Sequence, residues 1–524
     1  MPSKIKTTPS SEMNIVKFRF SSVKIKLFAL LFFAVSIIPN LLFAQFSQQG
    51  PKFVGSGAVG NPDLGSSVQI SSDGNTAIVG GPTDNSQVGA VWIFTRSGGV
   101  WTQQGSKLVG TGAVGSSQQG YSVAISSDGN TTIIGGYGDN TGTGSIWVFT
   151  RSGSVWTQQG SKLVGTGGSG ISWQGLSVAV SSDGNTIIEG GYHDNSNIGA
   201  VWIFTRTGSV WSQQGSKLVG SGGTGTTGQG SSVAISSDGN TAVVGGQLDN
   251  NFAGAMWVFI RTGAVWTQQS PKLVGSGVVG IARQGASVAI SADGNTFISG
   301  GPDDNSVTGA VWVFTRSGNV WTQQGSKIIG IGAIGNARQG ASVAISADGN
   351  TAVFGGYYDN NNAGAIWVFT RNGVNWTQLS KLVGTGPNGT AVLQGTSVAI
   401  SSEGTVIEGG LGDVPSGAAW IFNDPTIGIT PISSEIPKSF SLSQNYPNPF
   451  NPSSKIKFDI TKSSLTFIKV YNILGQEITT LVNEQLQPGT YEINFDGTNL
   501  PSGVYFYKLI AGDYVETKKM LMIK

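Results

Sequence analysis

The hydrophobic and polar residues of the chain follow a pattern that recurs every 55 residues from position 67 onward. In the first copy, short apolar stretches at Ser67–Ser71, Thr76–Val79, Ala90–Thr95 and Val100–Val109 are separated by Gly- and Asp-rich turns. Short runs rich in β-branched and aromatic residues, bounded by turn residues, are typical of β-strands. Each copy is therefore predicted to form one four-stranded antiparallel unit, with strands A to D in chain order.

Two markers give the number of copies. An Asp-Gly turn supplies the positive φ that a tight hairpin needs, and it recurs between strands A and B at Asp73, Asp128, Asp183, Asp238, Asp293 and Asp348, with Glu403 in the seventh copy. A tryptophan recurs in strand C at Trp92, Trp147, Trp202, Trp257, Trp312, Trp367 and Trp420. Seven such units predict an all-β fold, a seven-bladed β-propeller.

The two ends of the repeat region complement each other. Phe46–Lys52 matches strand D of the other copies, and the seventh copy stops after its strand C at Phe422. We therefore expect the N-terminal strand to complete the seventh blade, so that residues 45–424 form a closed ring. Closure removes the exposed sheet edges of the alternative, an open solenoid.

The repeats also carry a recognisable motif. The sequences Gly-Ala-Val-Trp-Ile-Phe-Thr-Arg at 89–96 and Trp-Thr-Gln-Gln-Gly-Ser-Lys-Leu at 101–108 resemble FG-GAP-type repeats, which occur in integrin α-subunit propellers and in many bacterial surface proteins. The resemblance covers residues 45 to about 423. It implies a propeller fold and leaves the function open, because one fold serves many activities.

The pattern changes after Pro425. Residues 425–437 are rich in Pro, Ser, Thr and Ile and are predicted to be a linker, and residues 438–524 a separate domain. That domain contains Gln444–Pro452, Val470–Gln476, Pro501–Tyr505 and a basic, apolar end at 518–524. These motifs resemble the type A C-terminal sorting domain of the bacterial type IX secretion system. The resemblance implies a small Ig-like β-sandwich that engages the secretion machinery and is commonly cleaved afterwards. The alternative is an ordinary immunoglobulin-like module that packs on the propeller.

The N-terminus has the pattern of an export signal. A basic flank is followed by an apolar run from Leu27 to Ala44, which predicts a signal peptide at 1–44, with Met13 as an alternative start. An uncleaved anchor is the competing interpretation, but Pro39 interrupts the run and no stable transmembrane anchor is expected. With the C-terminal resemblance, this predicts a protein that is secreted or held at the outer-membrane cell surface.

Composition narrows the chemistry. The 524 residues include 80 Gly and 14 Trp but no Cys, which excludes disulfides, thiolate metal sites and a cysteine nucleophile. The net charge is +2 without a basic stripe, so no nucleic-acid partner is expected. The one histidine, His193, occupies a variable loop position, and no Ser/His/Asp set can be drawn without it. We therefore expect a non-enzymatic protein.

Most charged residues are as periodic as the strands. An aspartate recurs in the B–C loop (Asp84, Asp139, Asp194, Asp249, Asp304, Asp359 and Asp413), where a turn-forming role is expected. A lysine recurs on strand D (Lys52, Lys107, Lys162, Lys217, Lys272, Lys327 and Lys381), where charge would discourage edge-to-edge association. The A–B turn offers one carboxylate, whereas calcium prefers about six to eight oxygen ligands. No cofactor is expected, and any calcium binding should be weak.

Residues that break the repeat are the candidates for function. They lie in the D–A and B–C loops, which emerge on one face of a propeller: Trp173, Arg283, Arg338, Tyr137, Tyr192, His193, Asp303, Tyr357 and Tyr358. A variable face with aromatic and charged residues predicts a binding surface for an extracellular glycan or protein. Three alternatives stay open: drift of tolerant loops, a carbohydrate-active lyase or hydrolase on the same face, and a purely structural surface protein.

Two carboxylates replace apolar residues within strand B. Glu189 and Glu408 stand where the first copy has Val79. Because an unpaired carboxylate is costly to bury, they are expected at the channel or at a loop edge.

Overall fold

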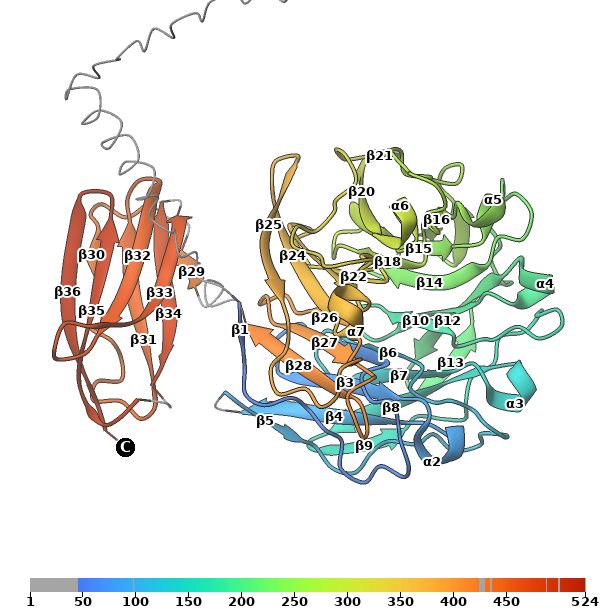
Figure 1. Cartoon of the computed structure of the whole chain (residues 1–524), viewed down its shortest axis with the longest axis horizontal. Helices are drawn as coiled ribbons and strands as arrows, with labels where there is room; N and C mark the ends of the chain where they lie inside the picture. The colour runs from blue at the N-terminus through green and yellow to red at the C-terminus, as the bar shows by residue number, and fades with distance from the viewer. Residues whose placement is uncertain are drawn as a thin grey trace, which may run out of the picture. The chain divides into compact units, whose positions relative to one another are not determined.

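The computed structural model describes residues 46–97, 99–423, 429–433, 436–486, 488–497 and 500–523 (Figure 1). The predicted signal peptide at 1–44 lies outside these residues. None of the helices in the described ranges is both long enough and apolar enough to cross a membrane.

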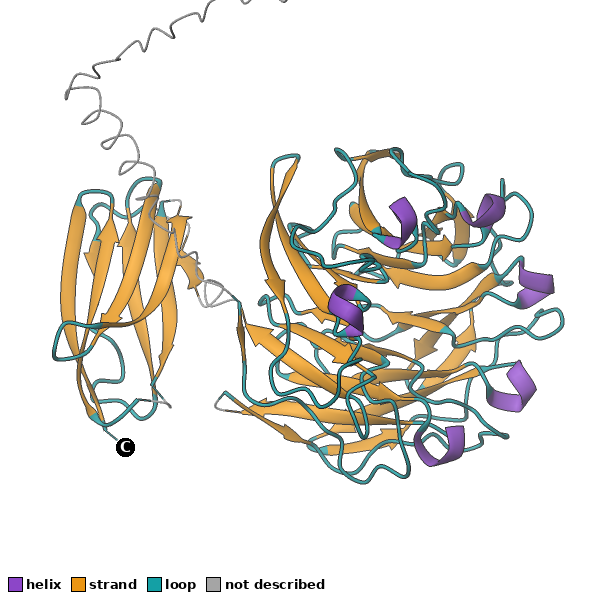
Figure 2. Ribbon diagram, in the orientation of Figure 1, coloured by secondary structure: helices purple, strands orange, loops and turns teal. Residues whose placement is uncertain are grey.

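The predicted seven-bladed propeller is confirmed. Residues 47–423 form seven four-stranded antiparallel sheets, and in each of them the strands are ordered A-B-C-D. Figure 2 shows that this region is built of strands and loops, with only short helical segments. Strand A is innermost, because residues of strand A from all seven blades line the central channel, including a cavity of about 230 Å³. The chain is therefore a ring of blades around an axial channel, as the repeat arithmetic predicts.

The strands have closely similar bounds from blade to blade. The A strands are β2 (Ser67–Ile70), β6 (Ser122–Ile125), β10 (Ser177–Val180), β14 (Gln229–Ile235), β18 (Ser287–Ile290), β22 (Ser342–Ile345) and β26 (Gln394–Ile400). The B strands are β3 (Thr76–Gly81), β7 (Thr131–Gly136), β11 (Thr186–Gly191), β15 (Thr241–Gly246), β19 (Thr296–Gly301), β23 (Thr351–Gly356) and β27 (Val406–Gly410).

Strands C and D form the outer half of each blade. The C strands are β4 (Ala90–Ser97), β8 (Ser145–Ser152), β12 (Ala200–Thr207), β16 (Ala255–Thr262), β20 (Ala310–Ser317), β24 (Ala365–Asn372) and β28 (Ala418–Asn423). The D strands are β5 (Val100–Gln103), β9 (Val155–Gln158), β13 (Val210–Gln213), β17 (Val265–Gln268), β21 (Val320–Gln323), β25 (Asn375–Leu382) and, for the seventh blade, β1 (Ser47–Gln48).

The N-terminal strand closes the ring. β1 pairs with β28 through Ser47↔Asn423 and Gln48↔Phe422. Phe46 is buried in the core between blades six and seven, and Phe53 stacks on Phe94 of blade one with ring centroids 4.4 Å apart. The closing segment is therefore packed against the blades on both sides of the seam.

A belt of backbone hydrogen bonds also links the blades at the A–B turns. The N–H of Ser72 donates to the carbonyl of Ser127 (3.1 Å), and the same contact recurs from blade to blade as far as Ala292–Ala347. It crosses the seam, where the N–H of Ser402 donates to the carbonyl of Ser72 (3.0 Å). An open solenoid could not make this last bond.

The expected positions of Glu189 and Glu408 are wrong. Both side chains are fully buried, and each pairs in register with the strand C tryptophan of its blade, Trp202 or Trp420. Strand B is the second strand from the channel, and both of its faces are covered by neighbouring blades, so its side chains have no route to solvent. The carboxyl oxygens make no hydrogen bond of good geometry among the described residues. Burial raises the pKa of both groups well above the ordinary value, although the backbone N–H groups of Gly165, near Glu189, and of Gly384 and Gly395, near Glu408, oppose the rise.

The C-terminal domain is a small β-sandwich with its own core. Its strands are β29 (Ile429–Ser433), β30 (Ser441–Leu442), β31 (Ser453–Ile460), β32 (Ser464–Tyr471), β33 (Glu477–Leu486), β34 (Gly489–Asp496), β35 (Gly503–Ala511) and β36 (Tyr514–Met522). They form two four-stranded sheets, β29-β34-β31-β30 and β33-β32-β35-β36, around one shared apolar core. Strand β29 lies within the range 425–437, where a linker was expected, because its backbone pairs with the edge of β34.

Candidate functional site on the loop face

The B–C loops of six blades contain a short left-handed turn. These turns are α2 (Asp84–Gln87), α3 (Asp139–Gly142), α4 (Asp194–Asn197), α5 (Asp249–Phe252), α6 (Asp304–Val307) and α7 (Asp359–Asn362). In α2, Asn85 and Ser86 have φ values of 50° and 57°. The first left-handed residue is asparagine in all six turns, consistent with its tolerance of this conformation. The repeat therefore fixes an unusual backbone shape on this face.

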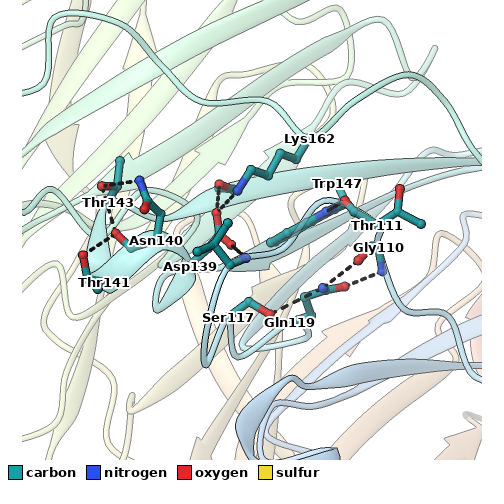
Figure 3. A network of polar contacts seen from close by, with 12 residues as sticks. Gly110, Thr111, Ser117, Gln119, Asp139, Asn140, Thr141, Thr143, Trp147 and Lys162 are labelled. Atoms are coloured by element: carbon teal, nitrogen blue, oxygen red, sulfur yellow. Dashed lines mark hydrogen bonds and ion pairs between the residues drawn. The ribbon is translucent and has the colours of Figure 1, made fainter.

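A buried aspartate holds each B–C loop in place. In blade two, Asp139 pairs with Lys162, which lies four residues beyond strand D (β9), and accepts hydrogen bonds from the backbone N–H of Val114 (2.7 Å) and from Ser145 Oγ (2.6 Å) (Figure 3). The same ion pair occurs in every blade: Lys52–Asp413, Lys107–Asp84, Lys162–Asp139, Lys217–Asp194, Lys272–Asp249, Lys327–Asp304 and Lys381–Asp359.

This finding changes the interpretation of both periodic sets. The aspartates are buried ion-pair partners as well as turn residues, and the lysines contact them across the blade. The lysines were predicted to protect sheet edges. Asp139 and Lys162 are 23 residues apart in the sequence, and this spacing alone does not indicate that they are in contact.

A glutamine anchors the D–A loop on the same blade. Gln119 is fully buried; its Oε1 accepts from the N–H of Gly110 (2.5 Å), and its Nε2 donates to the carbonyl of Gly110 (3.0 Å). Trp147 Nε1 donates to the carbonyl of Thr111 (2.9 Å) (Figure 3). The glutamine recurs in six blades, at Gln119, Gln174, Gln229, Gln284, Gln339 and Gln394, and this regularity was a signal that the sequence analysis missed.

These constant anchors position one variable residue per blade in a left-handed conformation. The residue precedes the buried glutamine, or Leu64 in blade one, and its φ is 52° to 61° at Asp63, Gln118, Trp173, Gly228, Arg283, Arg338 and Leu393. A non-glycine residue costs roughly 1–2 kcal/mol in this region, yet only blade four has glycine there. Six blades therefore keep a side chain at a position where the backbone favours glycine.

Blades two and three carry an aromatic cluster, which we define as Tyr121, Tyr137, Trp173, Tyr192 and His193. Ring centroids lie 4.5 Å apart for Tyr121–Tyr137, 5.3 Å for Tyr137–Trp173 and 4.2 Å for Trp173–His193. All five residues retain solvent exposure. Tyr121 was not among the predicted residues, because it directly precedes strand A (β6), at a position where the residue type differs from blade to blade. Partial burial and the neighbouring tyrosines raise its pKa.

Blades four to six carry a charged cluster, which we define as Phe252, Arg283, Asp303, Arg338, Tyr357 and Tyr358. Asp303 forms ion pairs with Arg283 Nε (2.7 Å) and Arg338 Nη2 (3.2 Å). Arg338 Nη1 donates to Tyr357 Oη (2.9 Å). Partial burial lowers the pKa of Arg338, but Tyr357 and Asp303 outweigh this effect and the pKa is raised.

The two clusters adjoin at blade four. A Cβ atom on Gly228 would lie 2.9 Å from the side chain of Leu248 and 3.1 Å from a ring carbon of Tyr192, so both side chains border the glycine. Burial raises the pKa of Tyr192, and the positive charge of Arg283 opposes the rise. Both clusters therefore belong to one surface, and the structure brings the predicted residues Trp173, Tyr137, Tyr192, His193, Arg283, Arg338, Tyr357 and Tyr358 into it. Phe252 belongs to the same surface and was missed, because a single exposed aromatic residue after Asp-Asn-Asn resembles loop variation.

The opposite face, formed by the A–B and C–D turns, repeats its contacts with little change. Asp128 Oδ1 accepts from Ser126 Oγ (2.5 Å) and from the N–H of Asn130 (2.9 Å). Arg151 stacks over Trp156, and Trp156 Nε1 donates to Gln104 of the preceding blade (2.9 Å). The aspartate oxygens of the A–B turn are thus used by the turn itself. In the part of the chain that the structure describes, no three His, Cys, Asp or Glu side chains form a group suited to a metal ion.

Comparison with known families identifies the C-terminal domain. Residues 444–524 match the family described as secretion system C-terminal sorting domain. The protein is therefore one that the type IX system secretes or places at the outer-membrane surface, and its C-terminal domain engages that machinery. The resemblance of residues 45–423 to FG-GAP-type repeats stays a prediction. No curated protein matches the sequence significantly.

Solved structures with similar folds share little sequence with this chain. Hydrazine synthase of Kuenenia stuttgartiensis is 12% identical (TM-score 0.43), with 68% of this chain and 94% of that chain covered. PorZ of Porphyromonas gingivalis, a surface component of the type IX secretion system, is 13% identical (TM-score 0.38), with 88% and 59% covered. The propeller domain of the Trilobed protease from Pyrococcus furiosus is 10% identical (TM-score 0.36), with 68% and 94% covered. The chain thus spans about three fifths of the length of PorZ.

Proposed function

We propose that this protein is a non-enzymatic recognition protein that binds an extracellular glycan on the loop face of its propeller. The observation that carries the proposal is the convergence of the off-repeat residues into one surface, on a backbone that favours glycine. Three of the six side chains at the left-handed position, Trp173, Arg283 and Arg338, lie in the two clusters, each at a conformational cost of roughly 1–2 kcal/mol.

The aromatic cluster favours a glycan over other ligands. Its rings are partly exposed and tilted by 51° to 75° to one another, so they offer several apolar faces at different angles. Such faces cover the apolar side of a sugar ring, while phenol, imidazole and amide groups bind its hydroxyls. A surface with a few polar groups among aromatic side chains is the usual composition of a binding site.

The carboxyl groups support binding over catalysis. Asp303 is the ion-pair partner of Arg283 Nε (2.7 Å) and Arg338 Nη2 (3.2 Å), so its carboxylate is already engaged within the charged cluster. The groups with strongly raised pKa values, Glu189 and Glu408, are buried between blades and cannot contact a ligand on the surface.

A glycan array tests the proposal with a matched pair of variants. Trp173→Gly introduces the residue that blade four has at the same left-handed position, so the backbone should tolerate it. Leu393→Gly makes the same change in blade seven, outside both clusters. We expect about a tenfold or greater loss of glycan affinity in Trp173→Gly, equivalent to about 1.4 kcal/mol, and no change in Leu393→Gly.

Two results would contradict the proposal. One is glycan binding that Trp173→Gly leaves intact. The other is a blank array together with capture of a defined protein ligand, which would make the loop face a protein-binding surface.

A further inference from the structure

Arg283 presents an unused hydrogen-bonding edge on the loop face. Its side chain is 36% exposed, and its Nε faces Asp303. Its ion pair with Asp303 is made through Nε, and no hydrogen bond within the described residues involves either of its terminal nitrogens. A guanidinium edge with two free N–H groups matches a carboxylate or sulfate, which can accept both bonds at once.

The guanidinium is held in place before any ligand arrives. Its carbon lies 4.7 Å from the centroid of the Phe252 ring, and the backbone N–H of Arg283 donates to the carbonyl of Phe252 (2.9 Å). Asp303 fixes the Nε side at 2.7 Å. Contacts on three sides reduce the conformational entropy that binding would otherwise have to remove.

The charge of the cluster is not balanced internally. Two arginines share one carboxylate, so Arg283, Arg338 and Asp303 together carry one net positive charge. Arg338 directs a terminal nitrogen to Tyr357, whereas Arg283 has no such neighbour. The unpaired positive charge therefore lies on the side of Arg283, and it acts on the Tyr192 hydroxyl of the aromatic cluster by opposing the rise in its pKa that burial causes.

A structural role does not explain this side chain. The equivalent position of blade four is Gly228, with a φ of 61°, and the loop there keeps the Gln229 anchor to Gly220. The scaffold therefore forms without any side chain at this position. An arginine here adds backbone strain and an uncompensated charge, both of which favour a role in binding.

We infer that the ligand is an acidic glycan: Arg283 binds a carboxylate or sulfate of the saccharide while neighbouring sugar rings lie on the aromatic cluster. The inference rests on the proposed glycan-binding function and adds the chemical class of the ligand. It requires an anionic group within one or two sugar residues of the stacked ring, because the two clusters adjoin across Gly228.

Calorimetric titration of the full-length secreted protein tests the inference. The probes are an oligogalacturonate, the same oligomer with its carboxyl groups reduced to alcohols, and a sulfated galactan oligosaccharide of similar length. We expect an acidic oligomer to bind at least about tenfold more tightly than the reduced one, since a charge-assisted hydrogen bond contributes about 1.5–3 kcal/mol. The preferred acidic probe shows which anionic group the site takes.

The variants separate this inference from the proposed function. Arg283→Gly should remove the preference for the acidic oligomer, Leu393→Gly should keep it, and raising the salt concentration should weaken acidic binding alone. Equal affinity for acidic and reduced oligomers, with Trp173→Gly still abolishing binding, would overturn the acidic ligand and leave the glycan-binding function standing. Failure of all three saccharides to bind, or binding that Trp173→Gly does not affect, would overturn both.

Discussion

The two faces of the propeller use the same repeat in opposite ways. On the turn face, backbone and side chains both repeat, and contacts such as Ser126–Asp128 and Trp156–Gln104 recur from blade to blade. On the loop face the backbone and its buried anchors repeat, but the exposed side chains differ. The difference shows that buried polar bonds fix the loop shape, so the residues above them change without loss of the fold.

One buried position of strand B also varies between blades, but there the variable side chain itself lies in the core. The strand B position that holds Val79 in blade one holds Ser299 in blade five, where the hydroxyl accepts from the N–H of Gly285 (2.9 Å). In blades three and seven it holds Glu189 and Glu408, whose carboxyl oxygens make no hydrogen bond of good geometry in the described structure. A change that is harmless on the loop face should therefore be costly here.

Breaking a loop-face anchor should have the largest effect. Asp139→Ala removes the partner of Lys162 and leaves the N–H of Val114 unsatisfied, so the free energy of unfolding should fall by about 3 kcal/mol. Asp128→Ala, on the turn face of the same blade, removes a partly exposed carboxylate and should cost about 1 kcal/mol. Denaturant unfolding compares the two. Equal losses in the free energy of unfolding would contradict a larger contribution of the buried ion pairs to stability.

Replacing a buried glutamate should stabilise the protein in a pH-dependent manner. Glu189→Val introduces the residue of blade one, and at pH 8 the free energy of unfolding should rise by about 2 kcal/mol, since an unpaired polar group is no longer buried. The pKa of Glu189 is raised in the folded state, so folding favours the protonated carboxyl group. This contribution to the free energy of unfolding is fully present below the ordinary pKa of 4.5 and is lost as the pH rises through the raised pKa.

The gain from Glu189→Val should therefore be smaller at pH 4 than at pH 8. Thermal unfolding at both pH values measures it, and Val244→Glu in blade four is the reciprocal control. A gain that is larger at pH 4 would contradict a raised pKa.

Relieving backbone strain on the loop face should have the smallest effect. Val307 ends the left-handed turn α6 with a φ of 71°, where blades three and six have Asn197 and Asn362. Val307→Asn should raise the free energy of unfolding by less than about 1 kcal/mol, because asparagine tolerates this region better than a β-branched residue. The melting temperature reports the change. A clear loss of stability would mean that the valine side chain makes a contact worth more than the strain.

Much of the fold and part of the site were predictable from local patterns. Asp73-Gly74 and its repeats predict hairpins, Trp92 and its repeats count the blades, and Phe46–Lys52 predicts the closing strand, because each signal depends on residues adjacent in sequence or on a fixed period. The variable residues of the site, from Tyr137 to Tyr358, were found as exceptions to that period. Tyr121 and Phe252 were missed because no local rule separates them from ordinary variation.

The number of blades, the closure of the ring and the secretion domain could all be predicted from the amino-acid pattern, since period, strand pattern and motif are properties of the chain alone. Which charges meet was set by the folded structure. It paired Asp139 with Lys162, placed Asp303 between Arg283 and Arg338, and buried Glu189 between two blades, because these outcomes depend on which residues the folded sheets bring within a few ångströms. Electrostatic interactions depend on distance in space and on burial, and neither is encoded in the spacing of residues along the chain.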